Sequence, residues 1–368
     1  MKILSVVGAR PQFIKAAAIT RRVKQMNEQS GPTNIDEVLL HTGQHYDWNM
    51  SRAFFEEMEI REPDYNLAVG SASHGAQTGR ILEGTETVLQ KEKPDGVLVY
   101  GDTNSTLAGA LAAVKMHIPV AHVEAGLRSF NRRMPEEINR VVADHISDLL
   151  FCPTETAVHN LAQEGIHKGV HMVGDVMYDC ALYYAQKAQS RHNLLTRLNL
   201  SPRQYALTTI HRAENTDDTG RLLSIFQALN RVAEAGLQII LPLHPRTRER
   251  LSVLHLKPSP RLRLLTPVSY LDMVVLERNA KLIITDSGGV QKEAYFYRVP
   301  CVTLRNETEW METVESGWNI LAGTDAESIA NAVVGARKPS RWRNHYGDGD
   351  AAGRILDVLL SLGVRPSR

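Results

Sequence analysis

The sequence predicts an α/β protein with two Rossmann-like, doubly wound domains that face a cleft. Short apolar runs alternate with longer amphipathic ones along most of the 368 residues. The short runs are apolar throughout, which is typical of parallel strands covered by helices on both faces. A chain of this length exceeds what one hydrophobic core usually takes, so two domains are expected. A single eight-stranded barrel with extra strands would also fit the alternation, but we favour two open sheets.

The strand candidates fall into two series. The first comprises 2–8, 36–43, 96–101, 119–126 and 149–154, and the second comprises 170–174, 205–211, 237–244, 262–268, 281–285 and 301–305. Helical patterns such as STLAGALAAVKMH and RLLSIFQALNRVAEAG lie between them. The stretch EGIHKGVH has loop composition and marks the predicted boundary. We therefore expect an N-terminal domain over residues 1–170 and a C-terminal domain over 171–349, with a closing helix in 350–368 that packs back on the first domain.

Composition argues against several classes of protein. A net charge of +1 gives no reason to expect binding to nucleic acid or to an anionic membrane surface. Cys152, Cys180 and Cys301 are scattered without CxxC spacing, which indicates buried, reduced thiols and a cytoplasmic protein. The apolar run at the N-terminus ends after about six residues, too short for a signal peptide. No segment approaches the roughly 20 apolar residues of a membrane span.

Polar side chains follow most of the predicted strands. They are Arg10, His41, Gln44, His45, Asp102, Glu124, His211, Arg212, His244 and the run Ser287–Gly289. In open α/β sheets, ligands bind outside the carboxyl ends of the strands. So many polar strand ends predict a ligand cleft between the two domains.

The stretch KLIITDSGGVQKEA, residues 281–294, contains the most specific of these strand ends. An apolar strand is broken by Gly288 and Gly289, and a helical pattern begins at Gln291. Such a junction exposes backbone N–H groups at the positive end of a helix, and glycines let a ligand approach closely. The functional interpretation is a diphosphate site. The alternative is an ordinary strand-to-helix turn capped by Asp286 or Ser287.

Fingerprints of common cofactors are missing from the sequence. GARPQF follows the first strand in place of a glycine-rich dinucleotide turn, and there is no Walker loop, HExxH motif or clustered Cys/His set. The DGD run at 348–350 precedes a helix and is interpreted as its N-cap. Gly43 separates His41 from His45, which favours ordinary hydrogen bonding. We expect neither a metal nor a cofactor.

Several carboxylates are candidates for proton transfer. Asp102 lies between a strand and a helix, where capping is the alternative role. Glu124 ends an apolar strand, where a carboxylate must be paired, and a salt bridge with Arg128 is the alternative. Glu136 and Glu137 fall in the first turn of a helix, a favourable place for any acid.

A set of longer motifs resembles one family. GARPQFIK, HTGQH, GDTNSTLAG, HVEAGLRSF, MPEEINR, HRAEN and TDSGGVQKEA are similar to the non-hydrolysing UDP-N-acetylglucosamine 2-epimerases. The matches run in order from residue 8 to about residue 310, and YGDGDAAGRI extends them nearly to the end. The resemblance implies a glycosyltransferase-B-like architecture, UDP bound by the C-terminal domain, a homodimer and no nicotinamide.

The resemblance also implies roles for particular residues. The catalytic candidates are Asp102, Glu124, Glu136 and His211. The substrate-binding candidates are Arg10, Lys15, Arg140, His244, Ser287, Gly288, Gly289, Glu293 and Trp310. Gln44, His45 and Arg80 match positions where some bacterial members bind a second, activating UDP-sugar. The sequence departs from simpler members at Gln12, which replaces glutamate, and at Trp310, which replaces arginine.

The absence of a dinucleotide fingerprint favours one chemical route. Inversion at C2 of an N-acetyl sugar proceeds either by oxidation at C3, which needs a nicotinamide, or by elimination of UDP and its re-addition to a glycal. We expect the second route. A hydrolysing 2-epimerase, a glycosyltransferase of the same architecture and a non-catalytic UDP-sugar-binding regulator are the alternatives.

The exact sugar is a further expectation. RSFNRRMPEEINR, HRAENTDD, LPLHPRT and TEW look most like the branch that acts on UDP-2,3-diacetamido-2,3-dideoxy-glucuronate for surface-polysaccharide synthesis. Arg132, Arg133 or Arg246 would pair with the uronate carboxylate, and Trp310 would pack on the acetamido group. In the alternative interpretation these arginines are solvated and Trp310 belongs to the core.

Overall fold

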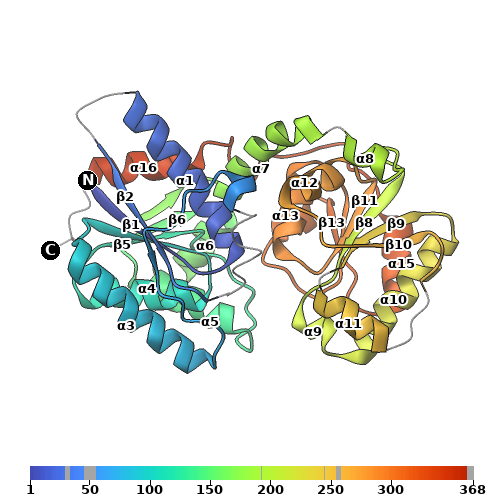
Figure 1. The fold of residues 1–368 in the computed structure, drawn as a ribbon, viewed down its shortest axis with the longest axis horizontal. Helices are drawn as coiled ribbons and strands as arrows, with labels where there is room; N and C mark the ends of the chain where they lie inside the picture. Colours follow the sequence, from blue (N-terminus) through green and yellow to red (C-terminus); the bar gives the residue numbers. More distant parts are fainter. Residues whose placement is uncertain (30–33, 45–54, 192, 244, 254–257, 363–368) are drawn as a thin grey trace. The chain divides into compact units, whose positions relative to one another are not determined.

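The structure is a computed structural model that describes residues 1–29, 34–44, 55–191, 193–243, 245–253 and 258–362. It divides into two compact units, each with its own sheet (Figure 1). The first unit is Met1–Leu182 together with Asn344–Arg368, and the second is Tyr183–Arg343. The sequence placed these two divisions after residues 170 and 349.

The first unit is built on a parallel sheet with the strand order β3-β2-β1-β4-β5-β6-β7. Its strands are β1 (Lys2–Val7), β2 (Asp36–His41), β3 (Tyr65–Asn66), β4 (Gly96–Tyr100), β5 (Val120–Val123), β6 (Leu149–Cys152) and β7 (Val170–Met172). Its helices are α1 (Arg10–Glu28), α3 (His74–Glu92), α4 (Asn104–Lys115), α5 (Pro135–Ile146), α6 (Glu155–Gln163) and α16 (Ala351–Leu362), and α7 (Val176–Lys187) leads into the second unit.

The strand at 170–174 corrects the sequence interpretation, which counted it as the first strand of the second series. In the structure, β7 pairs in parallel with β6, so it is the outermost strand of the first sheet. The loop composition of 164–171 indicated a boundary, but the loop connects α6 to the last strand of the same unit. The chain passes to the second unit later, within α7.

The second unit repeats the same winding, with the strand order β10-β9-β8-β11-β12-β13. Its strands are β8 (Tyr205–Thr209), β9 (Gln238–Pro242), β10 (Leu262–Leu265), β11 (Leu282–Thr285), β12 (Cys301–Thr303) and β13 (Asn319–Leu321). Its helices are η1 (Ala188–Arg191), α8 (Asn193–Arg197), α9 (Ala213–Thr216), α10 (Thr219–Glu234), α11 (Pro245–Val253), α12 (Tyr270–Asn279), α13 (Gly288–Phe296), α14 (Met311–Glu315) and α15 (Ala326–Gly335).

Both units confirm the predicted α/β class with Rossmann-like winding. In each sheet the order reverses next to the first strand, between β1 and β4 and between β8 and β11, and helices cover both faces (Figure 1). Ligands of such sheets bind beyond the carboxyl ends of the strands at this reversal. The loops after β1, β4, β8 and β11 are therefore the places where we expect a ligand to bind.

Burial explains why the strands are apolar throughout. Leu4 and Val6 of β1 pack with Val97 and Val99 of β4 in the core of the first unit. Each fully buried aliphatic side chain of this kind contributes about 1.5–3 kcal/mol relative to an exposed one. The three cysteines are free and buried, as the sequence predicted. Within the part of the chain that the structure describes, no helix is long and apolar enough to cross a membrane.

Helix α16 returns to the first unit and packs beside α1 (Figure 1). The carboxylate of Asp179 on α7 accepts hydrogen bonds from the backbone N–H groups of Ala351, at 3.1 Å, and Ala352, at 2.8 Å. Burial raises the pKa of Asp179 from 3.8 to about 6, although these two bonds act in the opposite direction. The attachment of α16 thus depends on a carboxyl group that titrates in a mildly acidic range.

This shift predicts a pH dependence of stability. Because the folded state holds the Asp179 proton more tightly than the unfolded state, the free energy of unfolding falls as pH rises from about 4 to 6. A shift from 3.8 to about 6 corresponds to about 3 kcal/mol. Asp179→Asn cannot titrate at this position. The free energy of unfolding of the variant, relative to that of wild type, should therefore increase as pH rises over this range. Urea denaturation at a series of pH values measures it, and a difference independent of pH would contradict the assignment.

Candidate functional site

The turn after β4 brings three separate segments of the first unit together. Gly101 has a left-handed backbone, with φ of +63°. A Cβ atom at this position would lie 3.0 Å from Nζ of Lys15 and 3.2 Å from Oε2 of Glu124. Glycine therefore serves both the backbone conformation and the close approach of an ammonium and a carboxylate.

Glu124 combines a buried charge with a strained backbone. It follows β5 with φ of +71°, a region that costs a non-glycine residue about 1–3 kcal/mol and is concentrated at functional sites. Its buried carboxylate forms an ion pair with the buried ammonium of Lys15 on α1. Arg128, the partner that the sequence suggested as an alternative, donates to Asp144 and Glu164.

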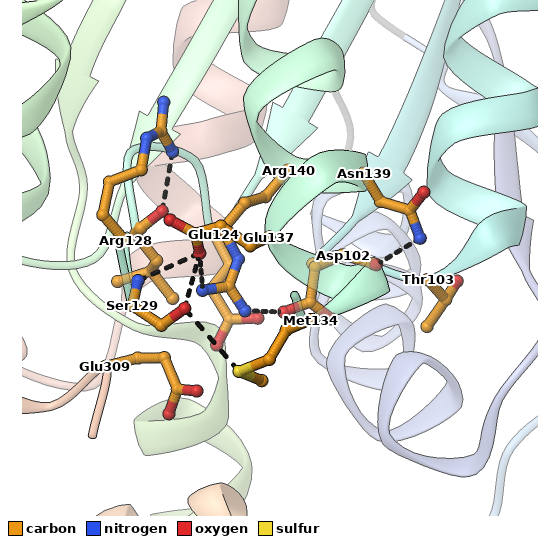
Figure 2. A network of polar contacts seen from close by, with 12 residues as sticks. Asp102, Thr103, Glu124, Arg128, Ser129, Met134, Glu137, Asn139, Arg140 and Glu309 are labelled. Carbon is orange, nitrogen blue, oxygen red and sulfur yellow. Dashed lines mark hydrogen bonds and ion pairs between the residues drawn. The ribbon is translucent and has the colours of Figure 1, made fainter. Parts of the chain in front are cut away.

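Asp102 is the more accessible of the two candidate carboxylates. Its side chain is 32% exposed, and Arg140 donates to its Oδ2 atom (Figure 2). The alternative role as a helix cap belongs to its neighbour, because the Thr103 side chain accepts the N–H of Thr106 at the start of α4. The carboxylate of Asp102 is thus held on one side by a guanidinium and reaches solvent on another.

The two neighbouring glutamates in the first turn of α5 have different environments. Glu137 is buried and accepts hydrogen bonds of 2.9 Å from the backbone N–H groups of Ser129 and Phe130 and a third of 2.8 Å from Arg140 (Figure 2). Glu136 is exposed. Glu137 therefore fixes the loop before α5, while the carboxylate of Glu136 faces solvent in the first unit.

Arg140 joins these groups. It is only 4% exposed, and its two terminal nitrogens donate to Asp102 and Glu137. The sequence proposed Arg140 for substrate binding. These contacts orient the Asp102 carboxylate, and substrate binding by Arg140 stays a prediction.

The loop after β1 is held by Gln12, the residue that replaces glutamate in this sequence. Its Oε1 atom accepts the N–H groups of Gly8, at 2.8 Å, and Ala9, at 3.0 Å. Its Nε2 atom donates to the carbonyl of Tyr100, at 2.7 Å, and to the hydroxyl of Thr106, at 3.0 Å. A carboxylate could not make the bond to the Tyr100 carbonyl, since it has no proton to donate. Arg10 is exposed at the first position of α1, next to this loop.

In the second unit, Asp286 ties the ends of β8 and β11 together. This buried carboxylate accepts hydrogen bonds from the backbone N–H groups of His211, at 3.2 Å, and Arg212, at 3.1 Å, and from Nδ2 of Asn215, at 3.1 Å. The His211 side chain is 50% exposed, and its Nδ1 atom lies 3.4 Å from Asp286. The imidazole of His211 is therefore placed beside the start of α13.

The glycine-rich turn lies at the start of α13, as the sequence predicted, but the helix already begins at Gly288 and not at Gln291. The Ser287 side chain is the N-cap of α13 and accepts the N–H of Val290. A Cβ atom at Gly288 would lie 3.4 Å from Nε1 of Trp310, and one at Gly289 would lie 3.8 Å from the Ser287 hydroxyl. The turn thus combines capping by serine with the free helix N-terminus that suits an anion.

Trp310 and Lys292 form a contact that the sequence did not indicate. The Nζ atom of Lys292 lies 4.0 Å from the centre of the indole ring of Trp310, a cation–π geometry, and both residues are buried. Next to them, Arg305 donates two hydrogen bonds, of 3.0 and 3.1 Å, to the carboxylate of Glu309. A buried cation, an indole and an ion pair therefore lie near Gly288.

Glu293 on α13 lies close to a tyrosine and to a second glutamate, both on α12. The Tyr270 hydroxyl donates to its Oε1 atom at 3.0 Å. Glu277 lies seven residues after Tyr270 on α12, hence on the same helix face. It is fully buried, neither of its carboxyl oxygens has a hydrogen-bond donor, and it faces Glu293. Burial, and then the charge of Glu293, raise the pKa of Glu277 well above its ordinary value.

Some of the remaining predicted site residues lie within the described part of the chain, and others lie outside it. Gln44 accepts hydrogen bonds from the backbone N–H of Ser105, at 3.0 Å, and from its hydroxyl, at 2.7 Å, and Arg80 is exposed on α3. His45, His244 and the side chain of Arg246 lie outside the described residues. Among the described residues, no group of three or more His, Cys, Asp or Glu side chains could hold a metal ion.

Comparison with known proteins identifies the class of enzyme. A family model described as UDP-N-acetylglucosamine 2-epimerase matches residues 27–360. The chain therefore belongs to the UDP-N-acetylglucosamine 2-epimerase family, as its motifs predicted, and is an isomerase.

Relatives and solved structures agree with this membership. A UDP-N-acetylglucosamine 2-epimerase homolog of Methanococcus maripaludis is 52% identical over 98% of this chain and 100% of its own length. The UDP-2,3-diacetamido-2,3-dideoxy-D-glucuronate 2-epimerase of Pseudomonas aeruginosa is 49% identical with the same coverage. The crystal structure of Methanocaldococcus jannaschii UDP-GlcNAc 2-epimerase in complex with UDP-GlcNAc and UDP has a TM-score of 0.90 and 46% identity, covering 98% of this chain and 100% of that one.

The raised pKa of Glu277 predicts a second pH effect. A carboxyl whose pKa is raised in the folded state destabilises the fold as pH rises above its ordinary value of 4.5. Glu277→Gln stays neutral, so we expect it to unfold at a higher temperature than wild type at pH 8. The gain should shrink toward pH 4. Thermal melts of both proteins across this range measure the trend. If the stability of the variant relative to wild type were lower at pH 8 than at pH 4, the raised pKa of Glu277 would be refuted.

Proposed function

We propose that the protein is a non-hydrolysing UDP-sugar 2-epimerase that inverts C2 by elimination of UDP and its re-addition. The observation that carries the proposal is the edge of the first sheet, where the partly exposed carboxylate of Asp102 lies on the turn next to the strained Glu124–Lys15 pair. Family membership and the UDP-GlcNAc and UDP in the relative from Methanocaldococcus jannaschii support it.

The chemistry explains why two carboxylates are useful. In the elimination, a base removes the C2 proton, the C1–O bond breaks, and its electron pair leaves with the β-phosphate of UDP. The product is a glycal with a C1=C2 double bond. Return of a proton to the opposite face of C2 and of the phosphate oxygen to C1 gives the epimer. No electrons are gained or lost overall, so a nicotinamide is not required.

We divide the work between the two units. Proton transfer at C2 is assigned to Asp102, Glu124 and Glu136 of the first unit. Arg140 orients Asp102 in this scheme. His211 of the second unit stays a catalytic candidate, as a proton carrier or as a contact of the diphosphate. The residues assigned to the nucleotide and its diphosphate are His244, Ser287, Gly288 and Gly289 of the second unit, with Arg10 and Lys15 as additional cations from the first. The carboxylate of Glu293, held by Tyr270, is assigned to the ribose hydroxyls.

The remaining expectations belong to this proposal as well. Gln44, His45 and Arg80 stay candidates for a second, activating UDP-sugar site. A cytoplasmic location agrees with a UDP-linked substrate and with three free, buried cysteines. The homodimer stays a prediction that sedimentation velocity would test.

The route predicts solvent label at C2. In D₂O, with UDP-N-acetylglucosamine or its diacetamido-uronate derivative and no added acceptor or NAD, the epimer should remain attached to UDP and carry deuterium at C2. Proton NMR distinguishes this from free N-acetylmannosamine, the product of a hydrolysing enzyme. A product made entirely without label would exclude elimination, and no turnover of either sugar would favour a transferase or a binding protein.

Substitution of the carboxylates predicts a loss of turnover rather than of nucleotide binding. Asp102→Asn, Glu124→Gln and Glu136→Gln should each lower kcat by ~10²–10⁴-fold, the usual contribution of a proton-transfer group. Affinity for UDP, measured by calorimetry, should change little. His211→Ala should also lower activity. Glu83→Gln, which alters an exposed carboxylate on α3, is the control. Near-normal kcat in two of the four site variants would overturn the assignment.

For the sugar, we propose UDP-2,3-diacetamido-2,3-dideoxy-glucuronate. Its support is the resemblance of the motifs to that branch and the 49% identity to the Pseudomonas aeruginosa enzyme. Arg132 and Arg133 are exposed before α5 and are candidates for the uronate carboxylate. Trp310, with the cation of Lys292 over its ring, is the candidate for the acetamido group.

This choice predicts a preference in kcat/KM. The value for the diacetamido-uronate should exceed that for plain UDP-N-acetylglucosamine. An ion pair with the uronate contributes about 1.5–3 kcal/mol, so Arg132→Ala or Arg133→Ala should reduce the preference roughly 10- to 150-fold. Turnover of both sugars by wild type and variants is the measurement. A better rate with the plain sugar would discard the subgroup and leave the epimerase proposal intact.

A further inference from the structure

His122 is a fully buried histidine in the HVEAGLRSF motif whose two ring nitrogens both meet acceptors. Its Nδ1 atom lies 2.7 Å from Oδ1 of Asp144, and its Nε2 atom lies 2.6 Å from the carbonyl oxygen of Gly101. A carboxylate and a carbonyl can only accept, so each ring nitrogen must carry the proton of its hydrogen bond. The ring is then an imidazolium.

The charge of this imidazolium is balanced along a buried network. Asp144 on α5 also accepts from Arg128, at 2.7 Å, and Arg128 donates two further hydrogen bonds, of 2.7 and 2.8 Å, to Glu164. Two cations thus alternate with two anions from the core toward the surface. Burial alone would raise the pKa of Asp144, but the charges and hydrogen bonds of His122 and Arg128 hold it below its ordinary value.

The network holds the backbone at both candidate carboxylates. On one side, His122 donates to the carbonyl of Gly101, the residue before Asp102. On the other, Asp144 accepts the N–H of Gly126 at 3.1 Å, two residues after Glu124. Gly101 and Gly126 both have left-handed backbones, with φ of +63° and +80°. His122 with Asp144 is thus an anchor that the two turns share.

We propose that His122, as an imidazolium, is a positioning residue that fixes the Asp102 turn relative to the Glu124 turn by connecting Gly101 to Gly126 through Asp144. This inference rests on the proposed function only for what the two carboxylates do. It assigns to His122 no contact with substrate. Its effect should fall on kcat, since proton transfer depends on sub-ångström placement, and not on affinity for UDP.

Two substitutions separate this role from a merely structural one. The amide nitrogen of glutamine is placed like Nε2 of histidine, so His122→Gln can still donate to Gly101. The amide nitrogen of asparagine is placed like Nδ1, so His122→Asn can still donate to Asp144 but does not reach Gly101. His171→Asn is the control, because His171 is a half-buried histidine on β7 of the same sheet.

We expect His122→Asn to lower kcat by about 10- to 100-fold and His122→Gln by less than about 10-fold, with thermal midpoints lowered alike and the Kd for UDP unchanged in both. His171→Asn should lower stability without lowering kcat. Equal losses of kcat in the two His122 variants, or a Kd for UDP that weakens in parallel with kcat, would overturn the positioning role.

A measurement on the wild-type protein keeps the inference testable if the variants do not fold or if the enzyme has another activity. In long-range nitrogen–proton spectra of protein labelled with ¹⁵N-histidine, the His122 ring should show protons on both nitrogens at pH 7.5. A neutral ring with a single N–H would overturn the inference. Failure of the proposed function would appear separately, as the absence of a C2-labelled epimer from the wild-type enzyme.

Discussion

The carboxylate of Glu124 leaves a buried strand and meets the ammonium of Lys15, and the backbone around them has the conformation that this pairing requires. A buried ion pair is stable only when geometry is good, because both charges have lost their hydration. Gly101 supplies the space, since any side chain there would press on both charged groups. The left-handed backbone of Glu124 directs its carboxylate to this space at a cost in strain. The site is thus organised around the Glu124–Lys15 ion pair, which needs both the loss of hydration and a strained backbone.

Buried carboxylates that accept backbone N–H groups recur throughout both units. Asp144 holds Gly126, Glu137 holds the residues before α5, and Asp286 holds the loop that carries His211. Asp179 does the same for the start of α16. Each fixes a turn that the sheet alone would leave without hydrogen-bond partners. Rigid turns of this kind place catalytic groups more reproducibly than loops held only by their ends.

The fold could be predicted from the sequence because its signal is local. Apolar strands that alternate with amphipathic helices indicate parallel sheets wherever they occur. The strand at 170–174 was assigned to the wrong sheet because strand pairing is a long-range property, and the three-residue β7 carries no sign of its neighbour.

The candidate site was predictable only in part. Asp102, Glu124 and the Ser287–Gly289 turn stand at strand ends, where polar residues are conspicuous. Glu277 and Lys292 lie within helices, and only the fold places them against Glu293 and Trp310. His122 precedes Glu124 by two residues on a buried strand, so its polarity was visible. Its partners Gly101 and Asp144 were not, because one lies in the turn after another strand and the other on a helix.

The first unit is discontinuous in the chain, and this has a consequence for biosynthesis. The ribosome makes all of the second unit before it makes α16. Until then, the surface of α1 that α16 covers is open, because α16, with its buried side chains Ile355, Leu356 and Leu359, does not yet exist. The second unit can reach its final form while the first still lacks a helix. Completion of the unit that carries Asp102 and Glu124 is therefore delayed to the end of translation, after the unit that carries the Ser287–Gly289 turn has emerged.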